Sequence, residues 1–218
     1  MATRGGPNIL LDYLTVSNDA ASIRSYPGSG DYWYNIYSST AEPTAIYGAV
    51  HNTDEGGAFG FDASNDYCVT GFGNGVDPST DPFTIECVVQ SNSTSSSRMF
   101  LATTSHADNT RCYFATNSGY WRMGIQNSGW GTGTIAVTTN PTHIAVSFMD
   151  GEAKMYVNGV FSHQKSYTSY ELLSNLNIGR GNGYYWGGNI FLVHIYKAAL
   201  SQDKILQNFN ALKGRFEL

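Results

Sequence analysis

Residues 142–161 read THIAVSFMDGEAKMYVNGVF, and this stretch decides the fold class. On both sides of Asp150-Gly151, apolar residues alternate with polar or small ones, which is the pattern of a strand with one buried face. Asp-Gly between two such runs is a strong hairpin signal, because the favoured two-residue turns need a positive φ. Asn158-Gly159 repeats the signal. The stretch therefore predicts two consecutive antiparallel hairpins.

The same alternation recurs along most of the chain. Residues 83–90 place an apolar side chain at every second position, with Val88 as the exception. Further strand-like segments between Ser, Gly and Asn clusters are RMFLATT, RCYFAT, YWRMGIQ, LNIGR and NIFLVHIY. We count about ten to fourteen short strands at a spacing of roughly 8–12 residues. The chain is therefore predicted to be all-β, an antiparallel jelly-roll β-sandwich.

One short helix is expected at the C-terminal end, over residues 201–213. Ser201 suits the N-cap, Asp203 lies in the first turn, and Gly214 follows the last turn. The apolar stripe at helical spacing consists of Ile205, Leu206, Phe209 and Leu212. We expect the first three of these side chains to hold the helix against the sandwich.

Composition excludes several function classes. Charged residues make up 13% of the chain, the net charge is −5, and there are 22 Ser, 19 Thr and 18 Asn. Lys and Arg stand singly, so we expect no nucleic-acid partner. No apolar run is long enough to cross a bilayer, so we expect no membrane insertion. The surface is predicted to be neutral and rich in hydroxyl groups.

The chain is interpreted as one domain over residues 1–218, with an N-terminal arm over residues 1–8. The first residues lack a charged segment followed by an apolar one, so we expect no signal peptide. The widely spaced Cys68, Cys87 and Cys112 suit neither a zinc site nor a disulfide framework. They are predicted to be small core residues in a protein made in a reducing cytoplasm.

Four segments together resemble the concanavalin A-like lectin/glucanase superfamily, and within it the laminin-G-like domains of bacteriophage virion proteins. In chain order they are SYPGSGDYWYNIYSS, GGAFGFDASNDYCVT, THIAVSFMDGEAKMYVNGVF and GGNIFLVHIYKAALSQDKILQNFNALKGRF. The resemblance extends from about Leu10 to the end of the chain. It implies a jelly-roll sandwich and a mostly non-catalytic role, either in carbohydrate binding or as a structural module of surface and virion proteins.

The acidic residues test the glucanase branch of this superfamily. Glycoside hydrolysis needs two carboxylates across the scissile bond, and the related hydrolases place acids at alternate positions of one strand. Among the 17 acids, Asp150 and Glu152 are the only pair two residues apart, and they straddle the predicted turn. Glu86 is alone on its strand. The sequence therefore predicts that the protein is not an enzyme.

Asp62, Asn65 and Asp66 are the candidate metal ligands, because calcium prefers carboxylate and amide oxygens in loops. The same residues suit the alternative, an Asx-turn network that closes the loop between two strands. We commit to no metal ligand and no cofactor, with calcium as the open alternative.

Six aromatic residues near glycine or at strand ends are candidates for a sugar site or a subunit interface. Exposed rings beside amides suit the apolar face and polar edge of a sugar. The same rings suit packing at the ends of the sandwich, or an interface, where Tyr and Trp are also enriched. The candidates are Tyr120, Trp121, Trp130, Tyr184, Tyr185 and Trp186.

These observations favour a bacteriophage virion structural protein, as a capsid decoration or a tail or fibre component that binds host-surface carbohydrate. The expected partners are other virion proteins, further copies of the chain in a trimer, and a host-surface glycan. Its location would be the virion, after assembly in the bacterial cytoplasm. The alternative is a free carbohydrate-binding protein or module, and a glycoside hydrolase ranks below both.

Overall fold

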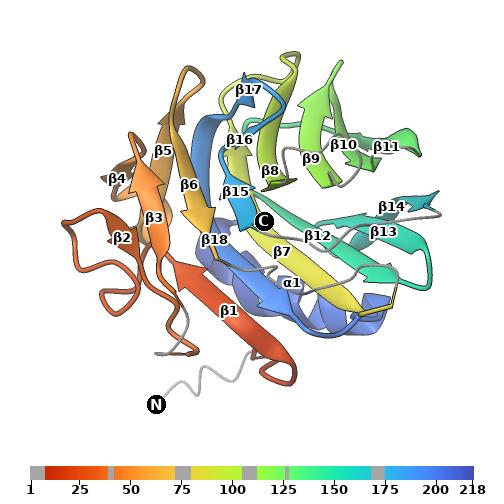
Figure 1. The fold of residues 1–218 in the computed structure, drawn as a ribbon, viewed down its shortest axis with the longest axis horizontal. Coiled ribbons are helices and arrows are strands. Elements are labelled where there is room, and N and C mark those ends of the chain that lie inside the picture. The colour runs from red at the N-terminus through yellow and green to blue at the C-terminus, as the bar shows by residue number, and fades with distance from the viewer. Residues whose placement is uncertain (1–7, 39–41, 72–79, 105–111, 126–127, 168–174) are drawn as a thin grey trace.

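Two antiparallel sheets face each other across the core in the computed structural model, which describes residues 8–38, 42–71, 80–104, 112–125, 128–167 and 175–218 (Figure 1). Residues 1–7 of the expected N-terminal arm lie outside the described part. Every strand pairing in this part is antiparallel, and the predicted all-β jelly-roll sandwich is confirmed.

The first sheet has the order β14-β13-β12-β7-β18-β5-β4, and β1 pairs with the same long strand β18 as β5 does. Its strands are β1 (Leu14–Asp19), β4 (Val50–Asn52), β5 (Ala58–Asp62), β7 (Phe83–Ser91), β12 (Thr142–Met149), β13 (Glu152–Val157), β14 (Val160–Ser166) and β18 (Gly187–Tyr196). A short 3-10 helix, η1 (Asp54–Gly56), precedes β5.

The second sheet has the order β11-β10-β9-β8-β15-β6-β3-β2. Its strands are β2 (Tyr32–Trp33), β3 (Thr44–Tyr47), β6 (Tyr67–Thr70), β8 (Arg98–Thr104), β9 (Cys112–Asn117), β10 (Tyr120–Ile125), β11 (Gly129–Ala136) and β15 (Asn175–Ile178). A separate hairpin is formed by β16 (Arg180–Gly181) and β17 (Tyr184–Tyr185), which pair only with each other.

The two predicted hairpin turns form as expected. Asp150 and Gly151 have φ angles of 51° and 75°, and Asn158 and Gly159 have 50° and 75°. Two successive positive φ angles are typical of the turn whose twist matches that of the flanking strands. Residues 142–161 therefore build β12, β13 and the start of β14 as neighbours in the first sheet.

The core lies between the sheets and is rich in aromatic side chains. Phe83 and Phe148 stack with ring centroids 4.3 Å apart, and Phe100 of the opposite sheet lies within the same cluster. The three cysteines are buried and free, as predicted. Burial raises the pKa of the Cys68 and Cys87 thiols, so both stay protonated and act as small apolar residues.

Helix α1 (Gln202–Phe216) covers the outer face of the first sheet, and its buried positions correct our prediction. Ile205 is buried, but Leu206 is 39% exposed and Phe209 is half-buried. The helix also passes Gly214, the predicted stop. Leu206 and Phe209 still contact the sandwich, beside Gly159 of the β13–β14 turn. The prediction omitted Asn208, a buried polar residue that hydrophobic periodicity cannot identify. The buried residues of the helix are Ile205, Asn208, Leu212 and Phe216.

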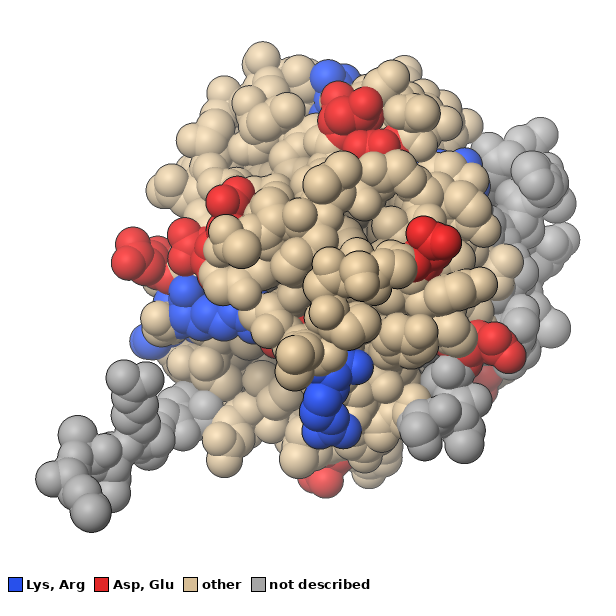
Figure 2. Space-filling view, turned by 90° about the vertical axis from the view of Figure 1, so that its left-hand side faces the viewer, with Lys and Arg blue, Asp and Glu red and all other residues tan. Residues whose placement is uncertain are grey.

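Charged side chains cover little of the face shown in Figure 2, where most of the described surface is uncharged. This agrees with the 13% of charged residues in the sequence. No helix in the described ranges has the length and apolar character needed to span a bilayer.

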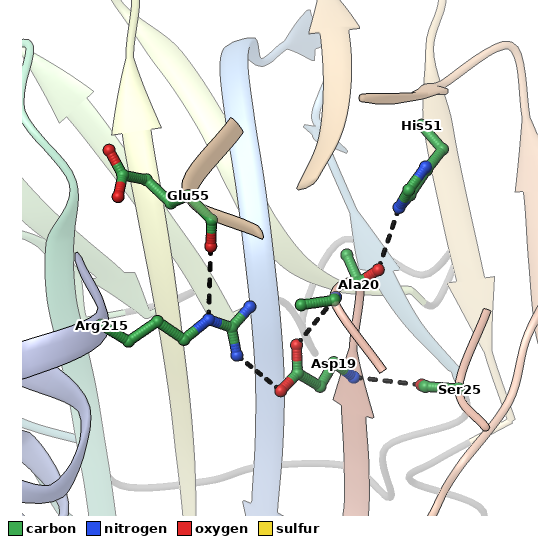
Figure 3. Close-up of polar contacts among 7 residues, drawn as sticks. Asp19, Ala20, Ser25, His51, Glu55 and Arg215 are labelled. Carbon is green, nitrogen blue, oxygen red and sulfur yellow. Dashed lines mark hydrogen bonds and ion pairs between the residues drawn. The ribbon is translucent and has the colours of Figure 1, made fainter. Parts of the chain in front are cut away.

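The C-terminal end of α1 is joined to the start of the chain through a polar cluster (Figure 3). Arg215 Nη1 donates to the Asp19 carboxylate at 2.6 Å, and its Nε donates to the Glu55 carbonyl at 3.4 Å. His51 Nε2 lies 2.9 Å from the Ala20 carbonyl oxygen. These contacts connect α1, β1 and η1, so the outer face of the first sheet is closed by the helix.

Candidate functional site

The outer face of the second sheet carries the site, because only part of it is covered. The β16–β17 hairpin lies against β8 on this face (Figure 1). A Cβ atom at Gly181 would stand 2.7 Å from Ala102 Cβ and 2.8 Å from Met99 Sδ. The hairpin therefore packs so closely that glycine is required at this point. Beside it, the outer faces of β8 to β11 remain open as a pocket.

The pocket has a volume of about 190 Å³ and lies between the hairpin and the neighbouring strands. Strands β8, β9, β10 and β11 form its floor, and the β16–β17 turn forms one wall. The lining residues are Ser97, Arg98, Met99, Ala115, Thr116, Asn117, Arg122, Trp130, Asn182 and Tyr184.

The register between neighbouring strands places the residues of the pocket floor side by side. Met99 is paired with Ala115, and Ala115 with Arg122, so these residues share one rung across three strands. Neighbouring residues on a strand point to opposite faces. Trp121 points into the core and Arg122 therefore points outward. The small Ala115 beside it leaves the room that the pocket occupies.

Trp130 forms an aromatic platform at one side of the pocket. It pairs with Gly124 across β10, and a Cβ atom at Gly124 would stand 2.8 Å from the indole ring. The indole therefore lies over bare backbone. Tyr113 stacks against it at 5.8 Å between ring centroids and 23° between planes, and Arg122 Cζ lies 4.9 Å from its ring centroid. The side chain is still 41% exposed, so part of this fixed ring is available to a ligand.

Polar groups surround the platform. Asn117 Nδ2 donates to Ser97 Oγ at 2.7 Å, and Arg98 Nη1 donates to the Ser97 carbonyl at 3.3 Å. Tyr184, which is 48% exposed, stands on the hairpin wall beside Asn182. Two exposed rings with amide, hydroxyl and guanidinium groups between them match the apolar faces and hydroxyl edges of a sugar.

Electrostatically the described part of the pocket is basic, because two arginines and no acid are among its described lining residues. Behind the platform, His163 lies against Gly131 of β11. Burial lowers the pKa of His163, and the nearby charge of Arg122 lowers it further. The imidazole therefore stays neutral at pH 7, and the positive charge at this end of the sheet belongs to the arginines.

Two of the six predicted aromatic residues, Trp130 and Tyr184, come together in this pocket. Tyr120 is exposed and lies two residues before Arg122 on β10, outside the pocket lining. Tyr185 is half-buried and pairs with Arg180 in the β16–β17 hairpin. Both tyrosines thus stay close to the site without contributing to its lining.

Trp121 and Trp186 are corrections, since both are buried in the core and are unavailable to a ligand or a subunit. Trp121 lies 5.7 Å and Trp186 lies 5.3 Å from the ring of Phe100, in each case with an edge-to-face geometry. The three consecutive aromatics from Tyr184 do not share one environment. Alternation and a change of chain direction turn Trp186 inward and leave Tyr184 outside.

The polar half of the site was not predicted from the sequence. Arg98, Asn117, Arg122 and Asn182 were not among the candidates, because their proximity depends on pairing between strands that are separate in sequence. A local signal existed for one of them. Arg122 stands between two residues with apolar side chains that face the core, so the alternation already placed a charge on the outer face.

The candidate calcium residues form the Asx-turn arrangement that was the alternative. Asp62 Oδ1 accepts from the backbone N–H groups of Ser64 at 2.8 Å and Asn65 at 3.3 Å. Asp66 Oδ2 accepts from the Asp62 N–H at 2.9 Å. The hydrogen bond from Ser64 is the main cause of the lowered pKa of Asp62, whereas desolvation raises the pKa of Asp66. Within the described ranges, no three His, Cys, Asp or Glu residues are grouped as metal ligands.

A second group of chemically capable side chains lies beneath α1 and is closed to solvent. Asn208 Nδ2 donates to Glu86 Oε2 at 2.8 Å and to the Tyr196 hydroxyl at 3.0 Å. His143 Nε2 lies 4.0 Å from the same Glu86 oxygen, and burial is the main cause of the lowered pKa of His194. All five side chains are almost fully buried. A substrate has no access to them, so the cluster serves the joint between helix and sheet.

Comparisons with known proteins agree with this fold. A laminin-G-type family model, described as "Concanavalin A-like lectin/glucanases superfamily", matches residues 62–206. A comparison with curated protein sequences gives no match. Among solved structures, the botulinum neurotoxin serotype D binding domain has a TM-score of 0.68 at 12% identity, covering 91% of this chain and 51% of that one.

Two further structures show the same likeness. Trypanosoma rangeli sialidase has a TM-score of 0.72 at 13% identity, covering 93% of this chain and 33% of that chain. A botulinum neurotoxin type C structure, whose cell entry is described as dependent on two ganglioside molecules, has a TM-score of 0.68 at 12% identity, covering 92% and 51%. The chain thus spans about half of the toxin chains and a third of the sialidase. At such identities the likeness is one of fold.

Proposed function

The chain belongs to the concanavalin A-like lectin/glucanase superfamily, and from that premise we propose that it is a non-enzymatic lectin-like domain that binds carbohydrate beside Trp130. The observation that carries the proposal is the pocket, which combines two exposed aromatic rings with amide and guanidinium groups. It lies on the one outer sheet face, within the described part, that no helix covers. Some structural neighbours are named for receptor or ganglioside interaction, which supports the same ligand class.

A binding role fits the pocket better than a hydrolytic one. Most glycoside hydrolases need two carboxyl groups facing the scissile bond, and no Asp or Glu is found among the described residues that line this pocket. Asp150 and Glu152, the one pair of acids two residues apart, flank the β12–β13 turn, and Glu86 is sealed beneath α1. The likeness to a sialidase concerns the fold and brings no catalytic residue to this site.

A glycan array tests the binding function directly. The full chain, multimerised so that weak sites gain avidity, should bind a subset of the glycans. The double variant Trp130→Ala/Tyr184→Ala should lose that signal. The control Tyr32→Ala/Tyr34→Ala removes two exposed rings at the far end of the same sheet and should keep it. Equal loss in both variants, or no binding by the parent chain to any glycan, would refute the proposal.

The biological setting belongs to the same proposal: the domain is displayed on a bacteriophage particle, as a capsid decoration or a tail or fibre component. Its support is the resemblance of four sequence segments to laminin-G-like virion domains. Assembly would take place in the bacterial cytoplasm. Mass spectrometry of purified particles should detect the chain, and its absence from the particles would rule this setting out.

Copies of the chain are proposed to associate as a trimer through uncharged, hydrogen-bonding surface. Charged residues make up 13% of the sequence, and most of the described surface on the face in Figure 2 is uncharged. Salt chiefly weakens interactions between exposed charges. Light scattering should therefore give a trimer mass that is unchanged between 0.1 M and about 1 M salt, where screening lengths fall from ~10 Å to ~3 Å. A monomer at every concentration would contradict this.

A further inference from the structure

The two arginines in the pocket indicate which class of glycan the pocket binds. This inference rests on the proposed carbohydrate-binding function. Among the described residues, Arg98 and Arg122 line the pocket and no acidic side chain does, although the whole chain has a net charge of −5. The site is thus locally basic in an acidic protein. Such a contrast favours an anionic ligand by electrostatic attraction.

Among the described residues neither arginine has a carboxylate partner, although Arg98 Nη1 donates to the Ser97 carbonyl and the Arg122 guanidinium lies over the Trp130 ring. Arg215 is paired with the Asp19 carboxylate, and Arg180 Nε donates to Asn177 Oδ1. Within the described residues, the Nε atoms of Arg98 and Arg122 are buried and have no hydrogen-bond partner. Neither side chain takes part in any of the ion pairs found there.

Within the described residues, no carboxylate neutralises the charge of either guanidinium, so this charge can attract an anionic group that enters the pocket. A guanidinium presents parallel N–H groups that match the two oxygens of a carboxylate. Hydroxyl groups of a neutral sugar offer no such paired negative charge.

The position of Arg122 relative to Trp130 indicates how a bound sugar would contact both residues. Arg122 Cζ lies over the indole ring, 4.9 Å from its centroid, so the guanidinium contacts the ring next to the part that remains exposed to a ligand. A sugar whose C–H face rests on Trp130 would bring a substituent at its rim to Arg122. Asn117 and Tyr184 remain around it for the hydroxyl groups. We propose that the pocket selects saccharides bearing a carboxylate, which Arg122 binds while Trp130 stacks against the sugar ring.

Pairs of glycans with and without carboxylate groups test this selectivity. The probes are tetragalacturonate with its methyl ester, and 3′-sialyllactose with lactose, each titrated calorimetrically into the full chain at low and moderate salt. The parent chain should bind the acidic member of at least one pair about 10- to 100-fold more tightly, the range for hydrogen bonds to charged groups. Added salt should narrow that gap.

Variants assign the preference to Arg122. Arg122→Met should bring the acidic glycan to the affinity of its neutral partner, and Arg122→Lys should keep part of the preference, because it retains the charge but loses the paired donors. Lys204→Met removes a positive charge from exposed helix α1, on the other side of the sandwich, and should change nothing. Unchanged melting temperatures establish that each variant is folded.

Three outcomes would overturn the inference. The parent chain could bind both members of each pair with equal affinity, or the preference for the acidic member could persist in Arg122→Met. Either result contradicts carboxylate selectivity through Arg122 and is compatible with carbohydrate binding. Tighter binding of sulfated oligosaccharides than of carboxylated ones contradicts the proposed ligand class. Absence of binding to every glycan on the array is a different failure, because it removes the proposed function itself.

Discussion

Replacing Asn208 by alanine should destabilise the protein by more than any other single polar change on α1. The side chain is fully buried and makes three hydrogen bonds. Its Nδ2 donates to Glu86 Oε2 at 2.8 Å and to the Tyr196 hydroxyl at 3.0 Å, and its Oδ1 accepts from the Leu10 N–H at 2.7 Å. Asn208 thus joins the helix, two strands and the start of the chain.

The magnitude follows from these partners. A hydrogen bond to a charged group contributes about 1.5–3 kcal/mol and a neutral one about 0.5–1.5 kcal/mol. Asn208→Ala should therefore lower the free energy of unfolding by about 2.5–6 kcal/mol. For a domain of this size, each kcal/mol corresponds to roughly 2–4 °C in melting temperature. The loss is large because Glu86 remains buried, and its other oxygen, Oε1, already has no partner.

Urea unfolding followed by tryptophan fluorescence measures the change. Asn210→Ala, at a half-buried position of the same helix, is the control and should alter stability by less than about 0.5 kcal/mol. Asn208→Asp places a second carboxylate next to Glu86. Its loss of unfolding free energy, relative to the parent chain at the same pH, should be larger at pH 7 than at pH 5. A loss below 1 kcal/mol for Asn208→Ala would show that the cluster beneath α1 does not hold the helix in place.

Three further predictions concern other parts of the fold. Burial lowers the pKa of His194 in the folded state, so the contribution of this residue to the free energy of unfolding is constant above its unfolded pKa of about 6.5 and decreases as the pH falls below that value. The melting temperature should therefore change less between pH 8 and pH 5 in His194→Gln than in the parent chain. Dialysis against EDTA should leave the melting temperature unchanged, because Asp62 and Asp66 accept backbone hydrogen bonds; a calcium-dependent rise would contradict this. Gly181→Val should displace the hairpin and abolish glycan binding while the core stays folded, as near-ultraviolet circular dichroism can check.

Turn chemistry is local, and it made the hairpins predictable from sequence. Asp150-Gly151 and Asn158-Gly159 need only the positive φ angles that these residues accept. The one break in the alternation of β7, Val88, has a tertiary explanation, since it packs with Phe191 and Leu212 beneath the helix. The outer face of this strand is buried as well, and a pattern that assumes one wet face cannot represent it.

Amphipathic periodicity located α1 but did not identify one of its buried residues. The buried side chain of Asn208 donates hydrogen bonds to Glu86, 122 residues away in sequence, and to Tyr196, 12 residues away. Only the folded structure shows that a polar residue can occupy that position. Leu206 is 39% exposed, and its side chain lies beside Gly159 at the β13–β14 turn.

Only the aromatic half of the candidate site could be predicted from the sequence. An aromatic residue next to glycine is visible within one segment, whereas a pocket forms from residues of several strands. Trp130 stands out in sequence for its flanking glycines, but its platform exists because Gly124 and Tyr113 of two other strands lie beneath and beside it. Arg122 reaches the same place through register alone. Trp121 was misassigned although the alternation around Arg122 already indicates that its side chain faces the core.

Chemical-shift mapping tests the central claim, that the pocket beside Trp130 is a carbohydrate site. The best-binding array glycan would be titrated into the isotopically labelled chain, with the indole N–H of each tryptophan followed separately. We expect the Trp130 indole, the Asn117 amide and the Arg122 Nε–H signals to move together and saturate, while the signals of buried Trp33 and Trp186 stay in place. Saturable shifts confined to another surface, with these three signals unmoved, would contradict the account.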